Sequence, residues 1–172
     1  MTQLSYQASF DPYHTIFRFF QISYILDYSE LPIDTMRIID YFLSFPYRLR
    51  IFSYKADHRA YREIYKSYEA LKPYGDQPDD FIVFKRMEHS QRAALTTMAN
   101  AGLIDSNSYI DGRIVFNNKN LPKQIKERIE KIHSSNTELH SLLRLLVSDY
   151  KLTGDNGLKK RSKLMEYRYD LV

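Results

Sequence analysis

Hydrophobic residues recur along the chain at helical spacing, in segments that proline and glycine separate. The first segment opens at Asp11-Pro12, which is typical of a helix start with aspartate as the N-cap and proline in the first turn. This helix is expected to run to about Tyr28. Because its apolar side chains cover most of its circumference, we expect it to be buried on several sides or to contact a partner.

Further helices are expected over residues 34–45, 57–71, 90–101 and 136–150, and after Leu121-Pro122, where hydrophobic positions recur three and four residues apart. Ser90 is the expected N-cap of the helix over 90–101. Gly102 is its expected stop, because glycine adopts the left-handed conformation without strain. Asp79-Asp80 has the character of a charged helix start. Residues 47–54 alternate between polar and apolar side chains and predict a short strand.

Residues 109–116 place Asp111-Gly112 between residues of high β propensity, a pattern typical of a β-hairpin. Helix, glycine cap, strand, turn and strand follow one another as at the end of a winged helix-turn-helix domain, with residues 90–101 as the recognition helix. The sequence thus predicts a mainly α fold with a small β-hairpin, and a winged helix-turn-helix-like core with additional helices. Residues 1–118 are expected to form this domain, residues 119–150 to add helices packed on it, and residues 151–172 to form a basic tail.

Tyrosine and phenylalanine are abundant, since the 172 residues include 15 Tyr and 10 Phe but no Trp. Aromatic side chains bury large areas and are enriched where protein surfaces meet, so their number suggests more contact surface than the core of a small chain needs. Two helix faces carry the candidate core or docking residues, and the core is the favoured place for those of the first helix. These residues are Tyr13, Phe17, Phe20, Tyr24, Tyr61, Tyr65 and Tyr68.

The net charge of +4 is unevenly distributed, with +4 in residues 47–72 and +3 in residues 151–172, but −2 in residues 73–118. The recognition-helix positions expected to be exposed are Ser90, Gln91, Ala94, Thr96, Thr97 and Asn100, with Arg92 as the only cation. Neutralising phosphates supplies much of the affinity for DNA, so we expect this segment to dock protein instead. The cations that could contact DNA are Lys85, Arg86, Arg92, Arg113, Lys159, Lys160, Arg161 and Lys163.

Candidate chemistry is sparse. The chain has no cysteine, which excludes disulfides, thiolate metal sites and cysteine nucleophiles, and it has no glycine-rich phosphate loop or hydrolase motif. His133 and His140 could share a helix face, but zinc needs a third ligand and closer spacing, so two surface histidines are expected and a metal enzyme is the least favoured hypothesis. No cofactor, metal or small-molecule substrate is expected. Without a signal peptide or a membrane-length apolar run, the expected location is the cytoplasm.

Several short stretches, in this order, give the chain a family resemblance over roughly residues 10–135. They are residues 11–15 with Phe17-Arg18, residues 37–43 ending at Phe45-Pro46, residues 91–95 leading into residues 101–105, and Leu121-Pro122. The set resembles the middle components of bacterial ABC-three-component defence systems, and within them the small LmuC-type subunit of Lamassu anti-phage and anti-plasmid systems. The resemblance implies a subunit without catalytic residues, whose partners are a structural-maintenance-of-chromosomes-type ATPase and an effector, often a nuclease.

Two functions remain as the main alternatives. The first is a non-catalytic adaptor that links the ATPase to its effector, with DNA reached through the complex and no membrane involved. The second is a free-standing winged-helix transcription regulator that reads DNA with residues 90–101 and Arg113, helped by Lys85 and Arg86. Steep loss of DNA binding with salt would distinguish the second from the first.

Overall fold

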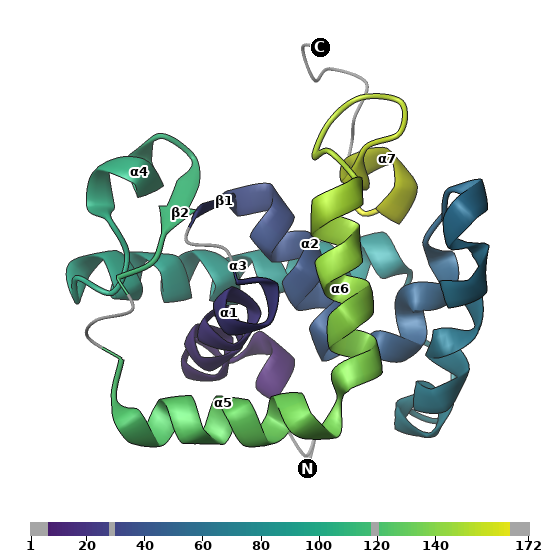
Figure 1. The fold of residues 1–172 in the computed structure, drawn as a ribbon, viewed down its shortest axis with the longest axis horizontal. Helices are drawn as coiled ribbons and strands as arrows, with labels where there is room; N and C mark the ends of the chain where they lie inside the picture. Colours follow the sequence, from purple (N-terminus) through teal and green to yellow (C-terminus); the bar gives the residue numbers. More distant parts are fainter. Residues whose placement is uncertain (1–6, 28–29, 118–120, 166–172) are drawn as a thin grey trace.

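Helices make up most of the computed structural model, which describes residues 7–27, 30–117 and 121–165 (Figure 1). The α-helices are α1 (Pro12–Leu26), α2 (Ile33–Ser44), α3 (Asp80–Asn100), α4 (Ser106–Ile110), α5 (Lys123–Ser135), α6 (Thr137–Asp149) and α7 (Leu158–Ser162). The 3-10 helices are η1 (Ala8–Phe10), η2 (Pro46–Ile51) and η3 (Ala56–Leu71), and the strands are β1 (Glu30–Pro32) and β2 (Arg113–Val115). This confirms a mainly α fold with a small antiparallel sheet.

The start of α1 is the predicted one. The Asp11 carboxylate accepts a hydrogen bond from the backbone N–H of His14 at 2.9 Å, and Pro12 occupies the first turn, where its missing N–H costs nothing. The helix ends when Asp27 adopts a left-handed conformation with a φ of 55°.

Helix α3 starts ten residues before the expected N-cap at Ser90. Asp79 is the cap, and its carboxylate accepts a hydrogen bond from Phe81 N at 2.9 Å. The buried Val83, Phe84 and Met87 continue the apolar stripe of Leu95 and Met98, so a single helix of 21 residues buries them all. Ser90 lies buried inside this helix and donates its hydroxyl proton to the Met87 carbonyl at 2.9 Å. The predicted cap at Ser90 is therefore wrong, whereas the charged start at Asp79-Asp80 is confirmed.

Gly102 ends α3 as predicted. It has a φ of 67°, which lets Leu103 N donate to the Met98 carbonyl at 2.9 Å and Gly102 N donate to the Ala99 carbonyl at 3.1 Å. These two bonds form a Schellman motif, which satisfies carbonyls that the helix end leaves free.

Only one strand of the sheet, β2, comes from the hairpin expected over residues 109–116. Tyr109 and Ile110 belong to α4, whose N-cap Asp105 accepts a hydrogen bond from Ser108 N at 2.8 Å. Gly112, with a φ of 79°, turns the chain from α4 into β2, which pairs with β1 in the register Leu31↔Ile114. Residues 115–117 also bond to residues 103–105, through Asp105 N to Val115 O at 2.9 Å and Asn117 N to Leu103 O at 2.8 Å.

The predicted strand over residues 47–54 is wrong, because this stretch begins with the 3-10 helix η2. Three consecutive side chains, Tyr47, Arg48 and Leu49, are all buried, which an alternating strand would not allow. The helix expected over residues 57–71 is present as the 3-10 helix η3. Its only fully buried side chain is Ile64.

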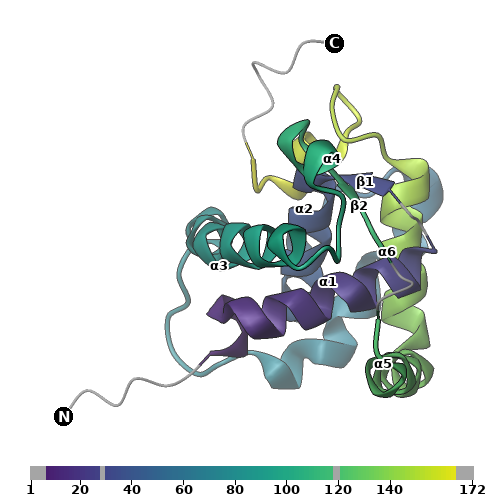
Figure 2. The ribbon, with the colours of Figure 1, turned by 90° about the vertical axis from the view of Figure 1, so that its left-hand side faces the viewer.

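Helix α1 lies at the centre of the molecule, in contact with α2, α3, α5 and α6 (Figure 2). One core cluster includes buried side chains of all five helices and extends to Leu158 and Leu164 near the C-terminus. The described part of the predicted basic tail thus packs against the body, while the three-part domain division stays a prediction. Within the described residues, no helix has the length and apolar content needed to cross a bilayer.

Candidate functional site

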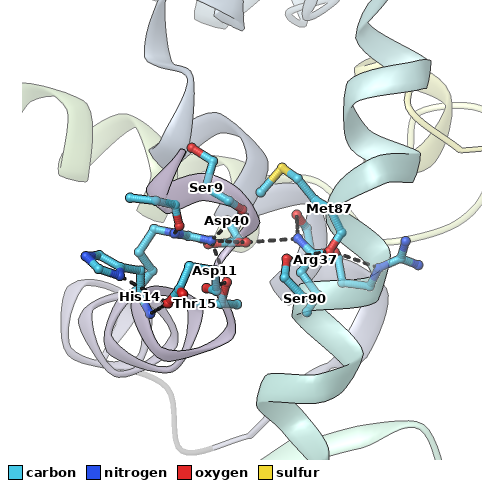
Figure 3. A network of polar contacts seen from close by, with 11 residues as sticks. Ser9, Asp11, His14, Thr15, Arg37, Asp40, Met87 and Ser90 are labelled. Carbon is cyan, nitrogen blue, oxygen red and sulfur yellow. Dashed lines mark hydrogen bonds and ion pairs between the residues drawn. The ribbon is translucent and has the colours of Figure 1, made fainter. Parts of the chain in front are cut away.

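A buried polar network joins α1, α2 and α3 around Asp40 (Figure 3). Asp40 lies on α2 and is fully buried. Arg18 of α1 donates from Nε to one carboxylate oxygen at 2.5 Å and from a terminal nitrogen to the other at 3.2 Å. Gln91 of α3 donates from its amide nitrogen to Asp40 Oδ2 at 2.9 Å. The carboxylate is thus paired with one guanidinium and held by a neutral amide on its other side.

Arg18 extends the network to η1. It donates to the Ala8 carbonyl at 3.0 Å and to the Thr15 hydroxyl at 2.9 Å. The Thr15 hydroxyl in turn donates to the Asp11 carbonyl at 2.8 Å. One arginine therefore fixes the segment that precedes α1 as well as the helix itself.

Gln91 also connects the network to a second buried arginine. Arg37 of α2 donates from Nε to the Gln91 amide oxygen at 3.0 Å. Its terminal nitrogens lie 3.4 Å from the Asp34 carboxylate and 3.6 Å from the Glu88 carboxylate, and its guanidinium lies 4.9 Å from the centre of the Phe84 ring. The amide of Gln91 thus uses both ends, as donor to Asp40 and acceptor from Arg37.

This arrangement is suited to holding helices together and offers little for catalysis. A general base or nucleophile needs an oxygen or nitrogen that can reach a substrate, whereas Asp40, Gln91 and Arg37 are all buried and bonded to one another. Buried charges are tolerated only when they are paired and hydrogen-bonded, and here both conditions hold. We therefore interpret the network as a structural element that holds α1, α2 and α3 together.

A second polar cluster lies where η2 meets the start of α3. The Asp80 carboxylate accepts hydrogen bonds from the buried Arg48 guanidinium and, at 2.7 Å, from the Tyr41 hydroxyl. Arg48 also donates to the Pro78 carbonyl at 3.2 Å. Burial and the neighbouring Asp80 carboxylate raise the pKa of Tyr41 well above its usual range, so this phenol stays protonated and acts as a hydrogen-bond donor.

The aromatic docking candidates of α1 lie in different surroundings. Phe20 is 4% exposed and packs 5.8 Å from the Phe116 ring, whereas Tyr13 is 78% exposed. Phe17 is partly buried beneath the Arg128 guanidinium, 5.0 Å from its ring centre. Tyr24 is exposed on one side and contacts the His133 ring edge-on.

The three tyrosines proposed for docking lie along η3 and are alike in their burial. They are partly buried against the core cluster and keep part of their surface exposed: Tyr61, Tyr65 and Tyr68. Their docking role stays a prediction.

The set of residues that α3 exposes to solvent differs in part from the set expected for a recognition helix. Ser90, Gln91 and Ala94 are buried, because the longer helix turns these positions toward α1 and α2. Thr96, Thr97 and Asn100 are exposed as predicted, with Arg92 beside them.

Most cations proposed for DNA contact already have partners within the chain. Arg92 lies 2.7 Å from the Glu88 carboxylate, and Arg113 lies 2.5 Å from the Glu30 carboxylate. Lys85 and Arg86 are exposed on α3 and form no ion pair with any described residue. These two are the candidate DNA contacts on α3 whose charge remains uncompensated.

The tail cations are also engaged. Lys159 lies 3.2 Å from the Asp34 carboxylate, and Lys160 lies 2.8 Å from the Asp155 carboxylate. Arg161 donates to the Ser53 carbonyl at 2.5 Å and to the Asn156 amide oxygen at 2.6 Å. Lys163 is exposed. The basic stretch therefore anchors α7 to the body instead of projecting freely.

The two histidines of the metal hypothesis are in contact, but one of them is not at the surface. Their Nδ1 atoms lie 2.8 Å apart and their rings are stacked, with His140 1% exposed. Burial, together with the neighbouring His133, lowers the pKa of His140 to about 4, so the His140 ring is neutral at pH 7. Across the described residues, no three His, Asp or Glu side chains gather into a metal-binding group.

The residues that form the network around Asp40 come from the stretches that carry the family resemblance. Asp11, Thr15 and Arg18 belong to the first stretch, Arg37 and Asp40 to the second, and Gln91 to the third. The sequence patterns did not predict that these residues form a buried polar network. A charge flanked on both sides by large apolar residues, such as Arg18 or Asp40, is the signal that could have found them, because such a charge is buried only with a partner.

The comparisons with known proteins agree with the broader resemblance. No curated protein and no solved structure matches the chain. The family model described as ABC-three component system Middle Component 5 matches residues 4–170. The match covers nearly the whole chain and supports the middle-component part of the resemblance, but not the LmuC-type assignment. The chain therefore belongs to the Middle Component 5 family of ABC-three-component systems.

Proposed function

We propose that this protein is a non-catalytic adaptor that links an ATPase to an effector within a three-component defence complex. The observation that carries the proposal is the contrast between interior and surface. The buried ionisable groups of α1, α2 and α3 are bonded to one another, whereas large apolar side chains stand exposed: Tyr13, Leu71, Tyr74, Phe81, Ile82 and Ile110. Exposed apolar groups of this size favour protein contacts.

The finer identity of the partners is part of the proposal. A middle component belongs to a system with two further components, and the resemblance to LmuC-type subunits of Lamassu suggests a structural-maintenance-of-chromosomes-type ATPase and a nuclease. The adaptor would hold the effector in an inactive arrangement, and DNA or ATP at the ATPase would favour another arrangement with different contacts.

The winged-helix interpretation is retained as part of this proposal, with protein as its target. In its favour, α1, β1, α2 and α3 are followed by residues 103–105, the short helix α4 and β2, and β1 pairs with β2. This order resembles that of a winged helix, with residues 45–79 inserted before the third helix and α4 in place of a simple turn. The exposed end of α3 presents Thr96, Thr97 and Asn100, which supports protein docking over phosphate binding.

Co-expression with the other two components, followed by size-exclusion chromatography, tests the adaptor proposal. We expect the chain to elute with both components in one complex and to be required for their association. A chain that elutes alone as a stable monomer in their presence would contradict the proposal.

The DNA-binding regulator remains a second candidate because Lys85 and Arg86 are exposed without ion pairs among the described residues. The purified chain should be titrated onto duplex DNA at about 50 mM and about 200 mM salt. Weak binding at both concentrations fits an adaptor, whereas tight binding that falls by a factor of roughly 10³ over this range would favour the regulator.

A further inference from the structure

A hollow of about 340 Å³ opens between η1, the end of α2, η2 and the start of α3. Its wall is largely apolar and includes Phe10, Phe45, Tyr47, Leu71 and Val83. Arg48 of the second polar cluster is also part of the wall. A volume of this size accommodates one or two large side chains or a small ligand.

Polar groups without partners lie in the wall of this hollow. Ser44 Oγ and Arg48 Nε are buried and have no hydrogen-bond partner among the described residues, although the other nitrogens of Arg48 bind Asp80 and Pro78. Arg86 also lines the hollow, and its exposed guanidinium forms no ion pair with a described residue. Both buried atoms, Ser44 Oγ and Arg48 Nε, are sealed from solvent, so Arg86 is the arginine of the wall that a ligand in the hollow can reach.

The charge of the wall indicates what that ligand carries. Of the described residues that line the hollow, two are arginines and none is acidic. Arg48 is balanced by Asp80, so Arg86 contributes the uncompensated charge. An apolar group with an adjacent carboxylate is complementary to this wall, since a carboxylate can accept hydrogen bonds from the exposed Arg86 guanidinium.

The surroundings favour a protein segment over a small molecule. Large apolar side chains stand exposed next to wall residues in the chain: Leu71 at 63%, Tyr74 at 105%, Phe81 at 41% and Ile82 at 46%. Charges of both signs flank them, with Lys72 and Lys85 as the cations and Asp76 and Asp79 as exposed acids. A small ligand inside the hollow would leave these side chains in water, whereas a peptide that enters the hollow with one side chain would cover them along its length.

We infer that this hollow and its apolar rim bind an acidic segment of a partner protein, which inserts a large apolar side chain and places a neighbouring carboxylate against Arg86. The inference rests on the proposed adaptor function and adds the surface and the chemistry of the partner. Residues 1–6 precede the wall residues Gln7 and Ala8 in the chain, but they contain no acidic side chain, so they do not meet the charge requirement.

Binding constants test the inference in the co-expressed complex. The affinity of the purified chain for the component with which it elutes should fall about tenfold in Arg86→Glu and by a similar factor in Leu71→Ser. Lys126→Glu on α5 makes the same charge change away from the hollow and should leave the affinity within about twofold. Because all three side chains are exposed, the variants should keep the wild-type unfolding temperature. Unchanged affinity in Arg86→Glu would overturn the inference while leaving the adaptor function intact.

A photo-crosslink identifies the occupant. Tyr74→p-benzoylphenylalanine, placed in the co-expressed complex and irradiated, should crosslink to an acid-rich segment of one of the other two components. A crosslink to residues 1–6, to a second copy of the chain or to a segment without acidic residues would overturn the inference, as would the absence of any crosslink in an intact complex. Failure of the complex to form at all would contradict the adaptor function itself.

Discussion

At the level of single residues, the buried carboxylate of Asp40 and the partly buried carboxylate of Asp80 each lie within hydrogen-bond distance of an arginine. Arg18 pairs with Asp40, and Arg48 pairs with Asp80. Removing water from a charge is costly, and a partner within reach offsets most of that cost. The effect of a substitution therefore depends on whether the partner is left buried without its counter-charge.

Asp40→Asn should strongly destabilise the fold. The substitution removes the charge that balances Arg18 and places an amide where two donors, Arg18 and Gln91, require an acceptor. We expect the free energy of unfolding to fall by about 3 kcal/mol, as for other broken buried ion pairs. Urea denaturation followed by circular dichroism measures this change. The control Asp155→Asn, at an exposed pair with Lys160, should leave stability unchanged, and equal losses in both variants would contradict the interpretation.

The buried His140 should make stability depend on pH. Its pKa is lowered to about 4 in the folded protein from an ordinary value of 6.5, so the unfolded chain binds more protons between these values. Its contribution is therefore fully present above pH 6.5 and is lost as the pH falls toward 4, by about 3 kcal/mol in total.

His140→Gln isolates this effect from the titration of carboxylates. Unfolding free energies of the wild type and the variant, measured between pH 7 and pH 4, should differ progressively less as the pH falls. Parallel curves would show that His140 is not the group responsible for the pH dependence.

At the level of elements, several helices start and end where short-range interactions, such as caps and a glycine with positive φ, favour it. The caps Asp11 and Asp79 and the stop at Gly102 could be predicted because each acts on residues within one turn. The hairpin could not be predicted correctly, since β2 pairs with β1 about eighty positions earlier in the chain and Asp105 starts a short helix where a strand was expected. The strand over 47–54 failed for a related reason, because the burial of Arg48 depends on Asp80.

Gly102→Ala should cost about 1 kcal/mol of stability. A Cβ at this position would meet no atom within 4 Å, so the cost comes from the positive φ alone. Gly102→Asn should lose roughly half as much, because asparagine tolerates the left-handed conformation better than alanine. Thermal unfolding of the three proteins measures the order. An alanine variant as stable as the wild type would show that the end of α3 can adopt another conformation.

At the level of the whole molecule, helices that are distant in sequence share one core cluster, and the described part of the tail packs against it. The three stretches that contact one another at Asp40 could be recognised in the sequence, but the contacts between them could not be predicted. Arg18 and Asp40 are 22 residues apart, and Asp40 and Gln91 are 51 apart, so only the packing of three helices brings them together. The burial of Leu158 and Leu164 is likewise set by contacts with earlier helices, which charge counting in the tail does not reveal.

Leu164→Ala tests whether the segment after α7 is part of this body. Leu164 is fully buried in the common core cluster, so its truncation should lower the free energy of unfolding by about 2–4 kcal/mol. Lys163→Ala changes the exposed neighbour and should have no measurable effect. If both variants unfold with the wild type in urea, the segment is dispensable for the fold.

The two-ended amide of Gln91 has a mechanical consequence. Its nitrogen donates to Asp40 and its oxygen accepts from Arg37, so a slip of α3 along α2 by one turn would break both hydrogen bonds at once. This pair of hydrogen bonds to one side chain therefore fixes the position of α3 along α2, and with it the surface that the exposed half of α3 can offer a partner.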